Sequence, residues 1–202
     1  MTRLLLDIGI AEMPSPGEAY SGDRCFVQQT GGHALLGVID GLGHGEEAAA
    51  AADTARAALA GPMPRSLAAL LRNCHDQLRE TRGVALTLMS FDAAASRLEW
   101  IGVGNVVAVL LHPEASGRLG SKELYVHSGV AGKQLPAVIA SSARLMRGDM
   151  VVAATDGVHY SFIEGIRRIE PPQQLAERLL RQYGTGRDDA LVVVAHIQRE
   201  AT

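Results

Sequence analysis

Apolar residues along the chain fall into two patterns: short dense runs that predict strands, and wider-spaced stripes that predict helices. The dense runs are bounded by Gly, Pro, Asn, Asp and Ser, as is typical of strand ends. They cover residues 3–13, 24–30, 33–40, 84–92, 97–104, 106–113, 123–129, 149–157 and 189–198. Gly31-Gly32 joins the second and third runs, and this linkage is typical of a hairpin.

Two neighbouring segments between these strands are predicted to be helices. Residues 45–60 are rich in alanine, carry two Glu in the first turn and are followed by Gly61-Pro62. Residues 65–82 space five apolar side chains along one helical face: Leu67, Leu70, Leu71, Cys74 and Leu78. Near the C-terminus, 161–169 and 171–184 are also predicted to be helical, the second because it has proline at its start and glycine at its end.

The order of these elements indicates the fold class. Strands come first, then two adjacent helices, more strands, and finally helices with a last strand, which differs from the strict alternation of a doubly wound fold. This order predicts an α+β fold with sheets in the middle and helices packed outside. No repeat, low-complexity segment or linker divides the chain, so we expect one domain over residues 1–202.

Composition excludes several classes of function. The chain has 202 residues, 47% of them hydrophobic and 20% charged, which is typical of a globular protein. A net charge of −3 and an aromatic content of 4% argue against nucleic acid or an anionic membrane as a partner. Cys25 and Cys74 form no CxxC motif, and the N-terminal apolar run, broken by Asp7, is too short for a signal peptide or a membrane span. We therefore expect a cytoplasmic protein.

Acidic residues stand at the ends of four predicted strands. Asp23 lies in SGD, Asp40 in VIDG, Asp156 in VVAATDG, and Asp188 with Asp189 in GRDDALVVV. A single such Asp is most often a turn former or a cap, but four sites in one chain predict strand ends that converge. Converging carboxylates are costly unless cations neutralise them, and oxygen ligands without Cys or His select Mg²⁺ or Mn²⁺. Glycine directly after the acid lets the backbone turn sharply and present its carbonyl to a metal.

In this order and spacing the four motifs resemble the metal-dependent serine/threonine phosphatases of the PP2C type. The closest likeness is to the SpoIIE-like branch, whose second motif is typically DGMGxG, where this chain has DGLGHG. The motifs span nearly the whole chain. The resemblance implies a β-sandwich of two antiparallel sheets flanked by helix pairs, with two Mn²⁺ or Mg²⁺ ions in a cleft at one end.

The resemblance also implies a role for each acid. Asp40 would bridge the two metals, Asp156 and Asp188 would complete one site, and Asp23 with the Gly41 carbonyl would complete the other. The residues alone leave the choice between Asp188 and Asp189 open. The family pattern favours the first of the pair as the ligand, and Asp189 would then be a helper or the ligand of a third ion.

The implied reaction is hydrolysis of a phosphomonoester by a metal-activated water, without a phosphoenzyme, in which Asp40 and Asp156 are central to catalysis. A catalytic domain of this size, without sensor or coiled-coil segments, is similar to the phosphatases that reset the stressosome. The expected partner is therefore a phosphorylated signalling protein, either a stressosome scaffold protein or one of the anti-anti-sigma type.

The chain also departs from the family pattern. Eukaryotic relatives place an Arg upstream of the first acidic ligand and a His two residues after the bridging Asp; Glu18 and Leu42 stand in the corresponding places. His44 is a candidate proton donor, and Arg24 and Arg187 are candidates for contacting phosphate, although an ordinary exposed surface position is the more usual role for each. These departures leave an alternative open, a phosphatase-like binding module with weak or no catalysis.

Two other readings fail on spacing. A dinucleotide-binding loop would need its third glycine one residue later, where Glu46 stands. A phosphotransferase with an aspartyl nucleophile needs Asp-x-Asp at a strand end, but Leu42 and Val158 occupy the second position after Asp40 and Asp156.

Overall fold

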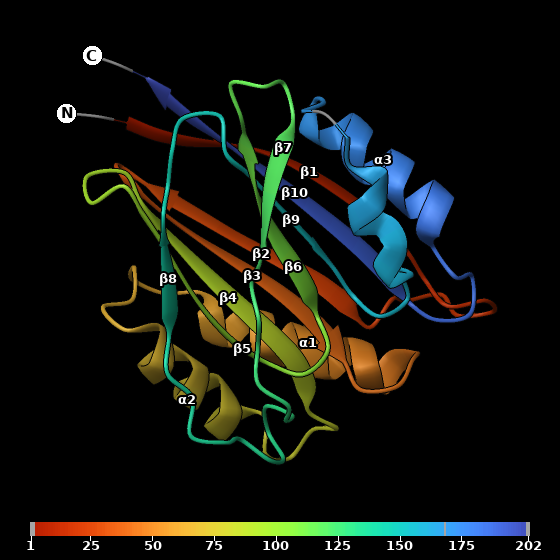
Figure 1. Cartoon of the computed structure of the whole chain (residues 1–202). Helices are drawn as coiled ribbons and strands as arrows, with labels where there is room; N and C mark the ends of the chain where they lie inside the picture. The colour runs from red at the N-terminus through yellow and green to blue at the C-terminus, as the bar shows by residue number, and fades with distance from the viewer. Residues whose placement is uncertain (1–2, 168, 201–202) are drawn as a thin grey trace.

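A computed structural model describes residues 3–167 and 169–200, which form two antiparallel five-stranded sheets and their covering helices (Figure 1). In the β1 sheet the strands are ordered β1 (Arg3–Met13), β10 (Ala190–Glu200), β9 (Met150–Ala154), β6 (Val107–Pro113) and β7 (Leu119–Glu123). In the β2 sheet the order is β2 (Asp23–Thr30), β3 (His33–Gly41), β4 (Val84–Asp92), β5 (Arg97–Val103) and β8 (Ser141–Arg144). The predicted α+β sandwich of antiparallel sheets is confirmed.

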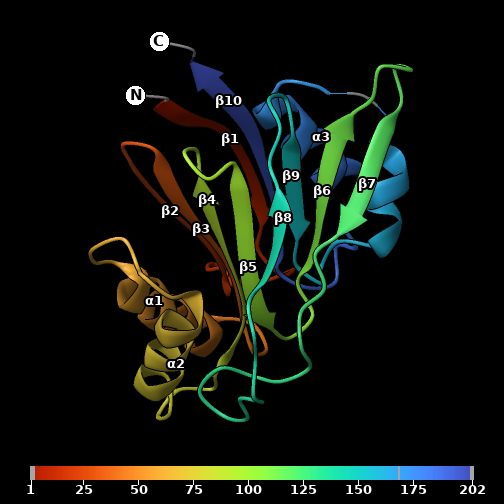
Figure 2. The ribbon, with the colours of Figure 1, turned by 60° about the vertical axis from the view of Figure 1, so that its left-hand side comes forward.

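The two sheets pack face to face around a shared apolar core (Figure 2). Side chains alternate along a strand, so each strand sends every second residue into this space. On β3, Val38 contributes to the core between the sheets, whereas Leu35 and Ile39 belong to the cluster under the helices. Burial on both faces explains why the central strands are unbroken apolar runs in the sequence.

Helices cover the outer face of each sheet (Figures 1 and 2). α1 (Glu46–Leu59) and α2 (Leu67–Gln77) pack on the β2 sheet, and α3 (Pro172–Tyr183) with the 3₁₀ helix η1 (Tyr160–Gly165) packs on the β1 sheet. The second helix pair is thus one α-helix and one short 3₁₀ helix. None of the helices in the described residues is both long enough and apolar enough to cross a membrane.

Small residues set how closely the helices approach the sheets. α1 buries Ala51, Ala52 and Ala55 completely, and these short side chains let the helix lie close to β3. On the other sheet, a Cβ at Gly9 would lie 2.1 Å from the backbone carbonyl carbon of Pro172. The first turn of α3 therefore rests directly on the backbone of β1.

Several predicted segments were wrong. The strand expected at 123–129 ends at Glu123, because β7 lies earlier, at 119–123, and only an isolated bridge at His127 follows it. β8 was not predicted, and the helix expected at 161–169 is a 3₁₀ helix over 160–165, with residue 168 outside the described residues. The second helix ends at Gln77 rather than at 82, since Leu78 forms its C-cap.

The acidic strand ends meet at one end of the sandwich. Asp23 and Asp40 are directly opposite each other in the β2–β3 ladder. Asp156 lies two residues after β9 and Asp188 two residues before β10, and these strands are neighbours in the β1 sheet. Each sheet thus supplies part of the acidic set.

Candidate metal centre

Five carboxylates form one electrostatic group, which we call the acid cluster: Asp23, Asp40, Asp156, Asp188 and Asp189. Asp40 is affected most. Burial raises its pKa to about 8, and the four other carboxylates act in the same direction. Among the described residues no side chain donates a hydrogen bond to Asp40. In this part of the chain its carboxylate therefore has like charges as neighbours and no side-chain donor to offset them.

Asp23 is the most deeply buried acid of the cluster, with 1% of the residue exposed. Burial raises its pKa to about 7, while a hydrogen bond from Thr155 acts in the opposite direction. Thr155 Oγ1 donates to Asp23 Oδ2 at 2.7 Å and accepts the backbone N–H of Leu191 at 2.9 Å. Because Thr155 follows β9 and Asp23 begins β2, this bond ties the two sheets together at the cluster.

Asp156 is exposed at the mouth of the cluster. Partial burial and then the charge of Asp188 raise its pKa, and a hydrogen bond from Asn105 opposes them. Asn105 Nδ2 donates to Asp156 Oδ2 at 2.7 Å. Sequence reasoning missed Asn105, although the Gly104-Asn105 pair between two predicted strands was a signal that could have indicated it.

The structure gives Asp188 and Asp189 different environments. Asp189 is buried, and its two oxygens accept the backbone N–H groups of Ser15 and Gly22, each at 2.7 Å. Asp188 is half-buried and lines a surface cavity together with Asp156. Asp189 therefore holds the β1–β2 loop against the start of β10, and Asp188 is the more accessible of the two for binding a cation.

Asp189→Asn should destabilise the fold by about 2 kcal/mol, because an amide nitrogen would face a backbone N–H that the carboxylate now satisfies. Asp188→Asn is the matched control, since among the described residues its side chain accepts one N–H, that of Asp189, and it is partly exposed. Urea unfolding of both variants at pH 7 without metal gives the comparison. Equal unfolding midpoints for the two variants would contradict the assignment.

Gly41 makes one of the close backbone approaches beside the cluster. Its N–H donates to the carbonyl of Gly22 at 3.1 Å, and a Cβ at this position would lie 2.3 Å from the carbonyl oxygen of Ala48. No other residue type fits without moving α1. The absence of a side chain here lets the first turns of α1 lie against the end of β3.

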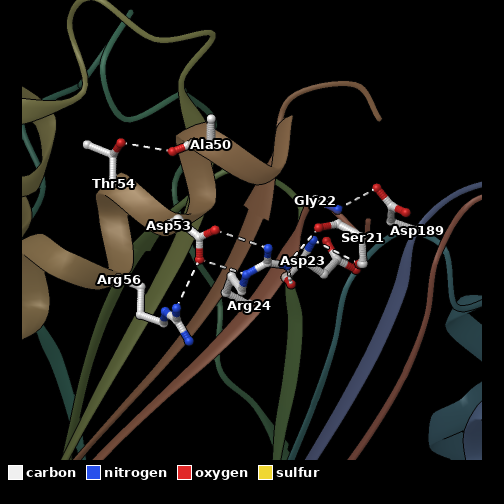
Figure 3. A network of polar contacts seen from close by, with 9 residues as sticks. All are labelled: Ser21, Gly22, Asp23, Arg24, Ala50, Asp53, Thr54, Arg56 and Asp189. Atoms are coloured by element: carbon white, nitrogen blue, oxygen red, sulfur yellow. Dashed lines mark hydrogen bonds and ion pairs between the residues drawn. The ribbon is translucent and has the colours of Figure 1, made fainter. Parts of the chain in front are cut away.

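The guanidinium of Arg24 is already bound by groups of the protein (Figure 3). Its Nε and Nη2 donate to the carboxylate of Asp53 on α1, and its Nη1 donates to the carbonyls of Ser21 and Asp23. Arg24 thus fastens the start of β2 to α1 and is not available to a ligand. Of the two arginines that the sequence suggested for contacting phosphate, Arg24 therefore has a structural role.

His44 and Glu18 pair with each other. Glu18 Oε1 lies 2.8 Å from His44 Nδ1, and 62% of the His44 side chain is exposed. A Cβ at Gly45 would lie 2.9 Å from Glu18, so the pair closes over the turn into α1. Glu18, which stands where the eukaryotic relatives have an Arg, therefore pairs with His44, the candidate proton donor.

In the described part of the chain, no three acidic, histidine or cysteine side chains stand close enough together to enclose one ion. The charges of the four other acids nevertheless all act to raise the pKa of Asp40. Both observations hold, because two charges interact over longer distances than the length of a metal–oxygen bond. The carboxylates therefore form one electrostatic cluster without closing on a common point.

Comparison with known proteins places the chain in a family. Residues 30–198 match the SpoIIE family, stage II sporulation protein E. No protein with a curated function is similar enough in sequence to count as a relative.

Three solved structures share the fold. One, described in work on the bacterial stressosome as a modular system adapted to control secondary messenger signalling, is 29% identical; the match covers 95% of this chain and 99% of that one, with a TM-score of 0.83. RsbX in complex with magnesium is 19% identical, with 98% and 100% covered and a TM-score of 0.83. The PP2C domain and regulatory fragment of SpoIIE from Bacillus subtilis is 17% identical, with 100% and 66% covered and a TM-score of 0.75.

These matches extend over nearly the whole chain and agree with the two-sheet architecture. At 17–19% identity, the likeness to RsbX and SpoIIE establishes the fold. The family match, by contrast, rests on sequence. It covers four acids of the cluster, Asp40, Asp156, Asp188 and Asp189, and leaves out Asp23. The chain belongs to the SpoIIE family and has the fold of the PP2C-type phosphatases.

Proposed function

We propose that this chain is a metal-dependent phosphatase that removes phosphate from phosphoserine or phosphothreonine on a signalling protein. The observation that carries the proposal is the acid cluster: five carboxylates from four separate strand ends meet at one end of a PP2C-type sandwich. In the reaction the oxygen of water forms a bond to phosphorus while the bond between phosphorus and the serine or threonine oxygen breaks. That oxygen takes up a proton, and the products are the free hydroxyl and inorganic phosphate. No group on the protein becomes phosphorylated.

The chemistry of the acid cluster suits hard divalent cations, although no three acids of the described residues already surround a common point. Asp40 has a raised pKa and no side-chain hydrogen-bond donor among the described residues, and Asp23 lies directly opposite it, an arrangement of like charges that is destabilising on its own. All the side-chain donors are oxygens, which Mg²⁺ and Mn²⁺ prefer. Asp40 would be shared by two ions, with Asp156 and Asp188 on one side and Asp23 with the Gly41 carbonyl on the other.

When bound, such ions activate water and neutralise charge on the phosphoryl oxygens. The residues of the chain hold the ligands in place for this. Thr155 fixes the rotamer of Asp23, Asn105 orients Asp156, and Asp189 anchors the loop before Asp23 without itself being needed as a ligand. A third ion held by Asp189 would have to compete with the two backbone N–H groups that it already accepts.

The proposed partner is a phosphorylated protein of a bacterial stress-signalling assembly, such as a stressosome scaffold or an anti-anti-sigma-type protein. Support comes from the 29% identical structure associated with the bacterial stressosome and from the near-complete mutual coverage with RsbX. We propose one domain over residues 1–202, in keeping with this coverage, and a cytoplasmic location, in keeping with the two cysteines, which are unpaired.

Hydrolysis of p-nitrophenyl phosphate with Mn²⁺, with Mg²⁺ and with excess chelator tests the proposal. We expect turnover that chelator removes and added Mn²⁺ restores. A folded protein that binds Mn²⁺ but releases no phosphate, from this compound or from a phosphothreonine protein, would instead identify the alternative of a binding module without catalysis.

A further inference from the structure

We propose that Arg187 binds the substrate phosphate at the acid cluster. This inference rests on the proposed phosphatase function and deepens it. Arg187 lines a cavity of about 740 Å³ whose wall also includes Asp156 and Asp188, two acids of the cluster. The remaining lining is mostly polar: His159, Ser161, Gln182, Tyr183, Gly184 and Thr185. A phosphate bound beside these two acids would therefore lie in the same cavity as the Arg187 guanidinium.

The loop that carries Arg187 is fastened to the loop that carries Asp156. The N–H of Thr185 donates to the carbonyl of Gly157 at 2.8 Å, and the N–H of His159 donates to the carbonyl of Tyr183 at 2.8 Å. The N–H of Arg187 in turn donates to Thr185 Oγ1 at 3.3 Å. These bonds fix the backbone position of Arg187 relative to Asp156, while its side chain is exposed.

The other arginines around the cluster are already engaged. Arg24 is bound to Asp53 and to two backbone carbonyls, and Arg82 forms an ion pair with Glu47. Arg187, by contrast, makes no side-chain hydrogen bond or ion pair with the described residues. It is the arginine beside the acid cluster whose donors remain available for a ligand.

The negative charge of the acid cluster favours a cationic side chain at the place where phosphate would bind. A phosphomonoester approaching five carboxylates meets like charge, and a guanidinium offers paired donors that match two phosphate oxygens. Glu18 stands where the family pattern has its upstream arginine, and it is paired with His44. Arg187 supplies a cation from the loop before β10, directly before Asp188 and Asp189.

Two measurements on Arg187→Ala and Arg187→Lys test the inference, with Arg72→Ala as the control because Arg72 is an exposed arginine on α2, on the other sheet. The first is steady-state hydrolysis of p-nitrophenyl phosphate with Mn²⁺. Loss of a charge-assisted hydrogen bond should raise KM in Arg187→Ala by about tenfold. We expect kcat to stay within about threefold, a partial rescue by lysine, and wild-type values for Arg72→Ala.

The second measurement is calorimetric binding of inorganic phosphate in the presence of Mg²⁺, which needs no turnover. An affinity for phosphate about tenfold weaker in Arg187→Ala than in Arg72→Ala would support the inference, whether or not the wild type hydrolyses the substrate. A wild type that binds phosphate but hydrolyses nothing would count against the proposed function alone. Equal phosphate affinity in wild type and Arg187→Ala, or no phosphate binding by the wild type, would overturn the role of Arg187.

Discussion

Replacing Asp40 by Asn will remove turnover and, at the same time, stabilise the metal-free protein at pH 8. Turnover should fall by about 10³-fold, because the residue shared by both proposed ions loses its charge. The metal-free fold should gain on the order of 2 kcal/mol, because burial and four neighbouring carboxylates raise the pKa of Asp40 to about 8 and an amide avoids that cost. Phosphate release and urea unfolding measure the two effects on the same sample.

Asp76→Asn is the matched control for this pair of effects. Asp76 lies on α2, is exposed and pairs with Arg79, so the same chemical change there should alter neither activity nor stability appreciably. An Asp40→Asn protein that retains turnover would remove Asp40 from the proposed metal centre. An Asp40→Asn protein less stable than wild type at pH 8 would show that the carboxylate is compensated in the metal-free chain.

The metal-free protein should lose stability as the pH rises from 5 to 8.5. The pKa of Asp23 is raised to about 7 and that of Asp40 to about 8, both above the ordinary value of 3.8. A raised pKa means that the folded state holds its protons more tightly than the unfolded state. This contribution is therefore complete below about pH 4 and disappears as the pH passes through 7 and 8. Together the two groups amount to a loss on the order of 3 kcal/mol.

Mg²⁺ or Mn²⁺ should reverse this loss, and more strongly at pH 8 than at pH 5.5, because the ions compete with protons for the same oxygens. At a concentration 100-fold above Kd, the stabilisation would be about 2.7 kcal/mol. Thermal unfolding across this pH range, with and without Mg²⁺, provides the measurement, and Asp40→Asn should flatten the metal-free profile. A wild-type profile that is flat without metal, or stabilisation by Mg²⁺ that does not depend on pH, would contradict the expectation.

The sequence predicts the acids and most of the strands because both depend on local pattern. The runs around β3 and β10 are apolar on both faces, and each ends or begins next to an acid, so their burial and the position of the acid follow from the same stretch. β8 gives no such signal. Its four residues, Ser141–Arg144, are mostly exposed at a sheet edge, where no apolar alternation is needed.

Roles that depend on a distant partner could not be predicted. Nothing near Arg24 in the sequence indicates that Asp53 would bind its guanidinium, and the neighbours of Asp189 do not reveal the N–H groups of Ser15 and Gly22. Both contacts join segments brought together only by the packing of the two sheets. The choice between Asp188 and Asp189 is open from the residues alone. We propose Asp188 as the ligand, because Asp189 is buried and its oxygens already accept two backbone N–H groups.

The strand order also determines when this centre can form during synthesis. β10 lies between β1 and β9, although it is the last strand along the chain, and Asp188 directly precedes it. A nascent chain that lacks β10 has β1 without its neighbour, and it holds Asp23 and Asp40 without their counterparts from the other sheet. Pairing of such distant segments is slow compared with local folding. A centre built from both sheets, as we propose, can therefore be complete only after the final strand has been inserted.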